Sequence, residues 1–170
     1  MTGPWTVTPL AKPALPALAA LLAAENLPNQ DIAEAGRRFW RVDAPDGLLG
    51  YGGLEVHGRD GLLRSVVVLP ERRRKGNGRA VVDAIAREAT ASGLERLWLL
   101  TIGAAGFFER IGFARAERSE APPGIRASAQ FAGLCPGSAV CLRRDLASPL
   151  AESAANDAAA AIPSEIAPVR

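Results

Sequence analysis

The 170-residue chain is poor in residue types on which several classes of protein depend, with two cysteines, one histidine and one tyrosine. Two cysteines are too few for the disulfide framework of a small secreted domain. Cys135 and Cys141 are therefore predicted to be reduced thiols, and the protein is predicted to be cytoplasmic. No metal site is predicted.

The chain also lacks a large net charge of either sign. The formal net charge is +2, so the sequence does not predict nucleic acid or an anionic membrane as a partner. The positive charge is nevertheless uneven, because Arg72, Arg73, Arg74 and Lys75 are consecutive. Any basic site is therefore local.

Long apolar runs are missing as well. No segment is apolar over the roughly 20 residues that a membrane-spanning helix needs. Residues 14–24 are apolar and follow Lys12, but Pro16 interrupts them and a strand-like segment precedes them. We therefore predict a first helix here rather than a signal peptide.

Hydrophobic periodicity predicts an alternation of strands and helices. The predicted strands cover residues 4–10, 38–43, 48–57, 62–69, 96–100 and 139–144, with one more beginning at Phe113. The predicted helices cover residues 13–25 and 104–111, a segment that ends at Gly93, and two short segments at 31–35 and 122–129.

This order indicates an antiparallel meander followed by a strand-helix-strand crossover. The fold class is predicted to be α+β, in three layers, with a mixed and mostly antiparallel central sheet of six to seven strands flanked by helices. Residues 1–146 are predicted to form this domain. Residues 147–170 are rich in Ala, Ser, Pro and Glu and are predicted to be a flexible tail.

A basic glycine turn, Arg73-Arg74-Lys75-Gly76-Asn77-Gly78-Arg79, follows a buried strand and opens a helix. Glycines allow a tight turn and a close approach of the backbone to a ligand. The N–H groups at the helix start then converge on an anion, assisted by the helix dipole and the basic side chains. A diphosphate would fit such a site.

The turn does not match two other glycine-rich phosphate-binding motifs. It lacks the Gly-Lys-Ser/Thr of a Walker P-loop, and Val81 stands where a dinucleotide fingerprint needs its third glycine. From the glycine pair alone, a solvated basic turn before a surface helix remains the stronger alternative.

Two sequence motifs, read together, favour a ligand-binding turn over a solvated one. Arg73-x-x-Gly76-x-Gly78 resembles the acetyl-CoA motif of the GNAT superfamily of N-acetyltransferases, and Thr101-x-x-Ala104-x-x-Phe107-Phe108-x-x-x-Gly112-Phe113 resembles the second motif of that family. Residues 97–101 and 125–141 are similar to a GNAT subgroup identified as arsenic-resistance N-acetyltransferases, which resembles amino-acid acetyltransferases of the N-acetylglutamate-synthase type.

The resemblance implies the GNAT fold and acetyl-CoA as cosubstrate. It implies that the strand before the turn splays from its neighbour and that the backbone of Val66, Val67 and Val68 pairs with the pantetheine arm. A strand N–H near Val66 or Val67 would bind the thioester carbonyl and the oxyanion formed on attack. The diphosphate would be held by Arg73, Arg74, Lys75, Gly76, Asn77, Gly78 and Arg79, and Phe107 and Phe108 would border the arm.

The chain departs from the family at Phe108, where the usual tyrosine would protonate the leaving thiolate. Water, or a hydroxyl or thiol of Ser138, Cys135 or Cys141, could supply that proton. A thiol has a pKa of about 8.5, so turnover need not require a dedicated acid.

The sequence defines the binding site for the acceptor amine less clearly than the binding site for acetyl-CoA. Glu55 is the predicted general base, with His57 as an alternative and a plain surface carboxylate as the other interpretation of Glu55. Arg64 and Arg126 are predicted to grip a substrate carboxylate, with Ser138 as a further substrate contact. Cys135 could be an arsenic ligand, although a structural role is the stronger interpretation.

The predicted function is acetyl transfer by direct attack of the primary amine of a small amino-acid-like substrate, with a role in arsenic or xenobiotic resistance. The alternatives are a non-catalytic CoA-binding sensor and a protein N-terminal acetyltransferase. Residues 122–138 would form the lid or wall that distinguishes these acceptors. A homodimer is plausible, because a mixed sheet exposes an edge.

Overall fold

The computed structural model describes residues 4–74 and 76–146, so Lys75 and the predicted tail lie outside the described residues. One seven-stranded sheet has the order β1-β2-β3-β4-β5-β7-β6. Its strands are β1 (Thr6–Pro9), β2 (Arg37–Ala44), β3 (Gly47–His57), β4 (Asp60–Val68), β5 (Arg96–Thr101), β6 (Ala114–Arg115) and β7 (Val140–Asp145). Strands β4 and β5 are parallel, and the other neighbours are antiparallel.

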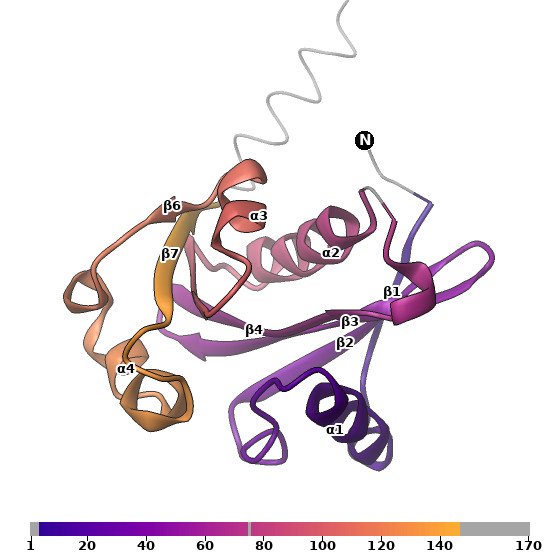
Figure 1. The fold of residues 1–170 in the computed structure, drawn as a ribbon, viewed down its shortest axis with the longest axis horizontal. Helices are drawn as coiled ribbons and strands as arrows, with labels where there is room; N and C mark the ends of the chain where they lie inside the picture. The colour runs from indigo at the N-terminus through magenta and orange to yellow at the C-terminus, as the bar shows by residue number, and fades with distance from the viewer. Residues whose placement is uncertain (1–3, 75, 147–170) are drawn as a thin grey trace, which may run out of the picture.

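The helices lie on both faces of this sheet (Figure 1). They are α1 (Leu15–Ala24), α2 (Asn77–Ala91), α3 (Ala105–Arg110) and α4 (Pro123–Arg126). Short 3₁₀ turns cover Lys12–Ala14, Pro70–Arg72 and Arg118–Glu120, and a π-helical turn, η4, covers Gln130–Leu134. No described helix is long and apolar enough to span a membrane.

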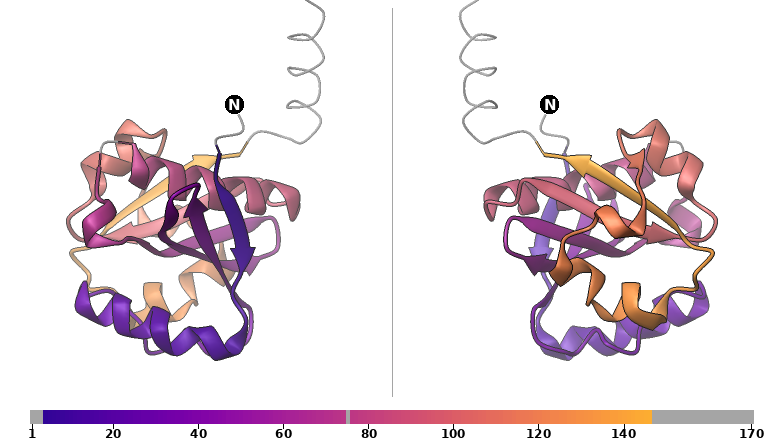
Figure 2. Two further views of the ribbon diagram at one scale, coloured as in Figure 1. Left: turned by 90° about the vertical axis from the view of Figure 1, so that its right-hand side faces the viewer. Right: turned by 90° about the vertical axis from the view of Figure 1, so that its left-hand side faces the viewer.

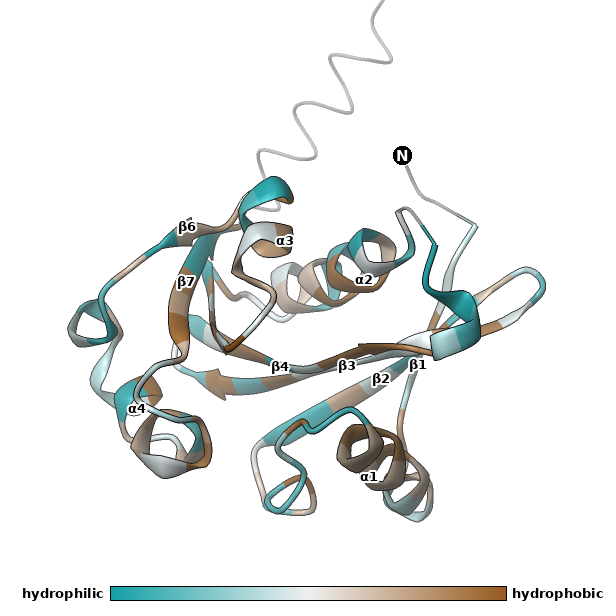
Figure 3. Ribbon diagram, in the orientation of Figure 1, coloured by the Kyte–Doolittle hydropathy of each residue, from teal (hydrophilic) through white to brown (hydrophobic). Residues whose placement is uncertain are grey.

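The two faces have separate cores. Helix α2 packs Val81 and Ile85 with Leu63 and Leu97 of the sheet, on the face that α3 also covers. On the opposite face, α1 packs Leu18 and Leu22 with Phe39 and Val67. Figure 2 shows the sheet edge-on between these layers, and Figure 3 shows the apolar character of α1 and of the sheet-facing side of α2. The predicted three-layer fold is therefore confirmed.

Two short predicted helices differ from the structure. Residues 31–35 form turns, so the helix predicted there is wrong. The side chain of Asp31 is bound by Arg64 and Arg37, and Gly36 has a φ of +82°, so this segment is fixed by long-range contacts and ends in a left-handed residue. The helix predicted at 122–129 is the single turn α4.

Helix α2 carries the glycine turn at its start and a glycine stop at its end. Gly93 has a φ of +84°, and the N–H groups of Gly93 and Leu94 donate to the carbonyls of Thr90 and Ala89. This is the glycine-dependent hydrogen-bond pattern that ends many helices. Buried side chains on one face of α2 then orient its N-terminus toward the end of β4.

Strands β4 and β5 pair over a short length. Only Asp60, Gly61 and Leu62 have partners on β5, and they face residues 96–98. The buried Asp60 carboxylate accepts a hydrogen bond from Trp98 Nε1 at 2.9 Å and another from Arg96 Nε at 3.0 Å. Asp60 therefore fixes the closed end of a V whose arms separate beyond Leu62.

We predict that Asp60→Ala lowers the free energy of unfolding by about 2 kcal/mol, because it leaves the buried Trp98 N–H without an acceptor. Urea denaturation at pH 7 measures this change. Glu95→Ala is a matched control, since Glu95 forms an exposed 2.7 Å pair with Arg59 and should contribute less than about 1 kcal/mol. Equal effects of the two substitutions would contradict the assignment.

Candidate functional site

A cavity of about 590 Å³ fills the V between β4 and β5. It lies where the two strands are no longer paired, and the starts of α2 and α3 close its other side. The lining residues come from four segments: Glu25 and Leu27, residues 63–68 of β4, Arg73, Arg74 and Gly78 of the turn, and Leu99, Leu100, Thr101, Ala104, Phe107 and Phe108. The splayed strands implied by the sequence are thus present.

The glycine turn opens onto this cavity. Gly76 is the N-cap of α2 and has a φ of +91°, a left-handed conformation that favours glycine. A Cβ at Gly78 would lie 3.0 Å from the Phe107 ring, so glycine allows α2 and α3 to meet at the cavity. The amide side chain of Asn77 donates to the Arg72 carbonyl at 2.6 Å and stabilises the turn itself.

The basic side chains of the turn have different partners. Arg72 binds the Asp46 carboxylate with both terminal nitrogens. Arg73 pairs with Glu25 at 2.7 Å, and Arg79 reaches Asp83 at 3.4 Å. Arg74 is exposed and lines the cavity. The structure thus brings Arg73, Arg74 and Gly78 to the cavity, with Arg79 on the first turn of α2.

A second cavity, of about 710 Å³, adjoins the first. It lies between residues 23–30, which end α1 and follow it, and residues 134–136 and 139, which precede β7. Amide side chains and apolar groups dominate its lining, and five residues line both cavities: Glu25, Leu27, Leu100, Thr101 and Ala104. The predicted wall at residues 122–138 contributes Leu134, Cys135 and Pro136 to this cavity.

Glu25 is the carboxylate that belongs to both cavity linings. It follows the last residue of α1, and its side chain is 25% exposed. Sequence reasoning missed it, because α1 is far from the glycine turn along the chain. The available signal was its position just before the break at 27–31, where a helix end and a loop bring polar groups to one place.

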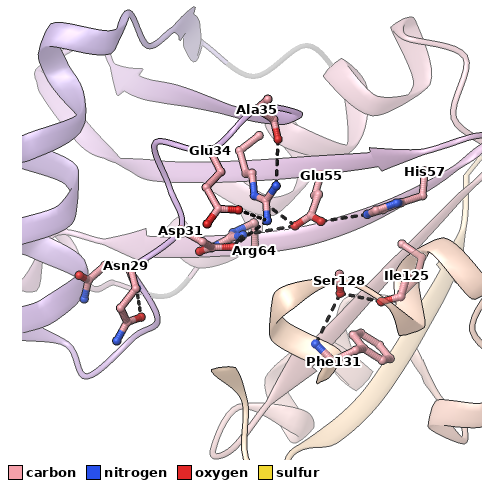
Figure 4. Close-up of polar contacts among 12 residues, drawn as sticks. Asn29, Asp31, Glu34, Ala35, Glu55, His57, Arg64, Ile125, Ser128 and Phe131 are labelled. Carbon is pink, nitrogen blue, oxygen red and sulfur yellow. Dashed lines mark hydrogen bonds and ion pairs between the residues drawn. The ribbon is translucent and has the colours of Figure 1, made fainter. Parts of the chain in front are cut away.

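A buried charge network lies on the α1 face of the sheet (Figure 4). The Arg64 guanidinium is fully buried and binds both oxygens of Asp31, one of them at 2.6 Å. It also donates to Glu55 at 3.3 Å and lies 5.9 Å from the centre of the Phe39 ring. Arg37 adds a contact to Asp31 at 3.2 Å.

The burial of Asp31 and its two arginine partners act in opposite directions on the pKa of its carboxyl group. Its burial alone would raise the pKa of the carboxyl group, but the hydrogen bonds and charges of Arg64 and Arg37 outweigh that effect. The pKa of Asp31 is therefore lowered. The pair clamps the loop after α1 onto β4.

Glu55 is 4% exposed and accepts hydrogen bonds within this network. Its carboxylate lies 3.0 Å from His57 Nε2. Both residues line a separate surface cleft of about 520 Å³, together with Gly124 and Ser128. Glu55 lines neither of the two adjoining cavities, so its role as general base stays a prediction.

The three predicted substrate contacts are not gathered at one place. Arg64 is a lining residue of the first cavity, but its guanidinium is occupied by Asp31 and Glu55. Arg126 and Ser138 are exposed and line neither of the adjoining cavities. Their roles in substrate binding stay predictions.

The second sequence block supports the cavity from β5 and α3. Thr101 Oγ1 accepts the Ala104 N–H at 3.1 Å, just before α3. Phe108 is buried and stacks edge-on between Phe107 and Phe113. Phe108 lines the first cavity, but its side chain has no hydroxyl group that could donate a proton there.

Burial disfavours the thiolate form of both cysteines. It raises the pKa of Cys141 to about 11 and also raises the pKa of Cys135, which lines the second cavity. The structural role of Cys135 stays a prediction.

Comparisons with known proteins agree with this geometry. A family model of the acetyltransferase (GNAT) domain matches residues 35–115. An amino-acid acetyltransferase of Mycobacterium tuberculosis is 36% identical over 88 residues, which are 49% of this chain and 50% of that protein. The chain therefore spans about half the length of this curated relative.

Solved structures share the fold. N-acetylglutamate synthase from Neisseria gonorrhoeae, crystallised with coenzyme A and L-arginine, has a TM-score of 0.68 at 20% identity and covers 85% of this chain and 34% of its own. A Mycobacterium tuberculosis protein crystallised with CoA has a TM-score of 0.66 at 24% identity, covering 84% of this chain and 99% of its own.

Residues 35–115 are thus similar to the acetyltransferase (GNAT) domain, and the described residues share the fold of these solved structures. The predicted fold is confirmed, and the similarity supports the predicted superfamily. The arsenic-resistance subgroup stays a prediction.

We predict that Asp31→Asn lowers stability at pH 7 by about 3 kcal/mol, because it leaves the buried Arg64 charge poorly compensated. Since folding lowers the pKa of Asp31, its stabilisation is present above the unfolded value of about 3.9 and is lost as pH falls through the folded value. Urea denaturation should therefore show the same difference in stability between wild type and variant at pH 7 and pH 5, and a smaller difference at pH 3.

Asp43→Asn is the control for that measurement, because Asp43 pairs with the exposed Arg41 and should change stability by less than about 1 kcal/mol at pH 7. A gap between wild type and Asp31→Asn that is independent of pH would show that the clamp does not depend on the Asp31 charge.

Proposed function

We propose that this GNAT-domain protein is an acetyl-CoA-dependent N-acetyltransferase that acts on the primary amine of a small amino-acid-like substrate. The observation that carries the proposal is the cavity between the diverging strands β4 and β5, with the glycine turn and the start of α2 at its rim. A second cavity adjoins it and can admit an acceptor.

The residues present fit acetyl-CoA as cosubstrate. Val66, Val67 and Val68 lie on the part of β4 that has no β5 partner, so the backbone groups on that edge of the strand can pair with the pantetheine arm. The Val68 carbonyl accepts a hydrogen bond from Arg73 Nε at 3.2 Å. Gly76 and Gly78 keep the start of α2 clear of side chains, as a diphosphate at a helix N-terminus requires. Arg74 in the cavity lining and Arg79 on the first turn of α2 would supply positive charge, and Phe107 would border the arm.

Bound acetyl-CoA would supply an activated acetyl group as a thioester. In the proposed reaction the neutral amine attacks the carbonyl carbon, a C–N bond forms and the C–S bond breaks. The proton lost by nitrogen passes to a base and finally, through solvent, to the thiolate sulfur. These proton transfers need no tyrosine in the place of Phe108.

Two carboxylates compete for the role of base. Glu55 is the sequence prediction, but it is engaged by Arg64 and His57 and lines another cleft. Glu25 is also paired with an arginine, Arg73 at 2.7 Å, but this pair is partly exposed. Glu25 lines both adjoining cavities and so lies where an amine in the second cavity would meet a thioester in the first. We therefore propose Glu25 as the base and Glu55 as a member of the buried network.

The lining of the second cavity supports a small polar acceptor. Asn26, Asn29 and Gln30 offer amide donors for a carboxylate, and Glu25 offers a negative partner for an amine. The similarity to an amino-acid acetyltransferase and to N-acetylglutamate synthase points the same way. Organoarsenical and phosphinic amino acids belong in the acceptor screen, because the sequence resembles the arsenic-resistance subgroup.

We expect CoA thiol release from acetyl-CoA in the presence of an amino-acid analogue, and calorimetric binding of CoA by the protein. Arg74→Ala should weaken CoA binding about tenfold, since it removes one charged hydrogen bond to phosphate. Arg115→Ala on the distant β6, where Arg115 pairs with Glu109, is the control and should bind normally.

Each alternative function has its own outcome in this experiment. Tight CoA binding with no release of thiol by any amine would favour the non-catalytic sensor. Turnover with peptides but not with free amino acids would favour the protein N-terminal acetyltransferase. No CoA binding at all would contradict the proposed function.

The two candidate bases can be separated with isosteric substitutions. Glu25→Gln should lower kcat by about 100-fold, the lower end of the range for general base catalysis, with little change in melting temperature. Glu55→Gln should lower the melting temperature, because Arg64 loses a buried negative partner, and should leave kcat within a few fold of wild type. The reverse result would assign the base to Glu55.

A further inference from the structure

Strand β4 contains a bulge inside the first cavity. Tyr51 pairs with Val67 and Gly53 pairs with Arg64, so Ser65 and Val66 together face the single residue Gly52 on β3. Such a bulge adds one residue to a strand and redirects the side chains around it. Ser65 and Val66 both line the cavity between β4 and β5.

Ser65 adopts a backbone conformation that its residue type disfavours. Its φ is +54°, in the left-handed region where glycine occupies most such bulge positions. Non-glycine residues in this region persist where the surrounding structure holds them, and they cluster at functional sites. The backbone here would favour glycine, yet the chain carries a hydroxyl group.

The Ser65 hydroxyl is also unsatisfied. Ser65 is 9% exposed, and among the residues that the structure describes its Oγ has no hydrogen-bond partner. Buried hydroxyl groups are normally hydrogen-bonded, so this group requires an explanation. Thr101, the other hydroxyl residue of the cavity lining, already accepts the Ala104 N–H.

We propose that Ser65 is a catalytic residue whose hydroxyl donates a hydrogen bond to the thioester oxygen of the bound acetyl donor. This inference rests on the proposed function. Ser65 and Val66 line the cavity on the part of β4 that has no β5 partner, so the hydroxyl and a strand N–H would share one oxygen as their acceptor.

The chemistry of this contact is hydrogen bonding without proton transfer. As the amine attacks the carbonyl carbon, negative charge grows on the carbonyl oxygen, and a donor already positioned there stabilises that charge more than it stabilises the ground state. The charge returns to the carbonyl when the C–S bond breaks and the thiolate leaves. Ser65 thus supplies a polar donor in a cavity where Phe108 supplies none.

Two substitutions separate the hydroxyl from the backbone. Ser65→Ala removes the hydroxyl and keeps the disfavoured conformation, whereas Ser65→Gly removes the hydroxyl and relieves that conformation. Without ligand, Ser65→Gly should raise the melting temperature by about 2 to 4 °C and Ser65→Ala should not. Both should lower kcat by at least about tenfold, with the KM for the acceptor little changed.

Calorimetry gives a readout that does not depend on turnover. The hydroxyl should contact the acetyl donor but not free CoA, so both variants should bind acetyl-CoA several-fold less tightly than wild type while their affinity for CoA is unchanged. Ser128→Ala is the control, since Ser128 is buried but its Oγ already donates to the Ile125 carbonyl at 2.6 Å.

The possible results are distinguishable. Loss of kcat and of acetyl-CoA affinity in both variants supports the proposal. Wild-type values in both variants overturn the role of Ser65 and leave the proposed function standing. A loss in Ser65→Gly alone assigns the effect to the shape of the bulge and also overturns it. A wild-type protein that binds neither acetyl-CoA nor CoA overturns the proposed function and this inference together.

Discussion

The limited pairing of β4 with β5 is the constraint on which the candidate site depends. Three residue pairs hold the strands together, and the Asp60 carboxylate joins Trp98 and Arg96 at that closed end. Beyond it, helices α2 and α3 fill one side of the gap, and the strand edges line the other. A longer ladder would satisfy more backbone groups but would leave no cavity.

Much of this arrangement could be predicted from local sequence. The meander, the glycine turn and the amphipathic pattern of α2 each follow from residue spacing, and residues of the turn line the cavity in the structure. The bulge at Ser65 could not be predicted in the same way. It depends on the pairing register of β3 and β4, and the residue types of the Ser65-Val66-Val67 segment do not predict a left-handed backbone conformation.

The charged side chains show a second limit of prediction from the sequence. Arg64 was predicted to bind a substrate carboxylate, because a guanidinium can grip a carboxylate with two hydrogen bonds. The anion is internal: Asp31 comes from a loop 33 residues earlier, and the segment around it forms turns instead of the predicted helix. Similarly, Glu25 meets the cavity only because α1 packs across the sheet. Such partners are set by tertiary packing, which periodicity does not report.

The ion pair between Arg73 and Glu25 has a thermodynamic consequence. It joins the glycine turn to the wall shared by both cavities, so the Arg73 guanidinium lies between the Glu25 carboxylate and the cavity that the turn opens onto. A ligand that draws Arg73 away from Glu25 changes the charge presented to a molecule in the neighbouring cavity. By linkage, that second molecule must change the affinity of the first by the same factor. Such a displacement would couple the two cavities energetically through a single side chain.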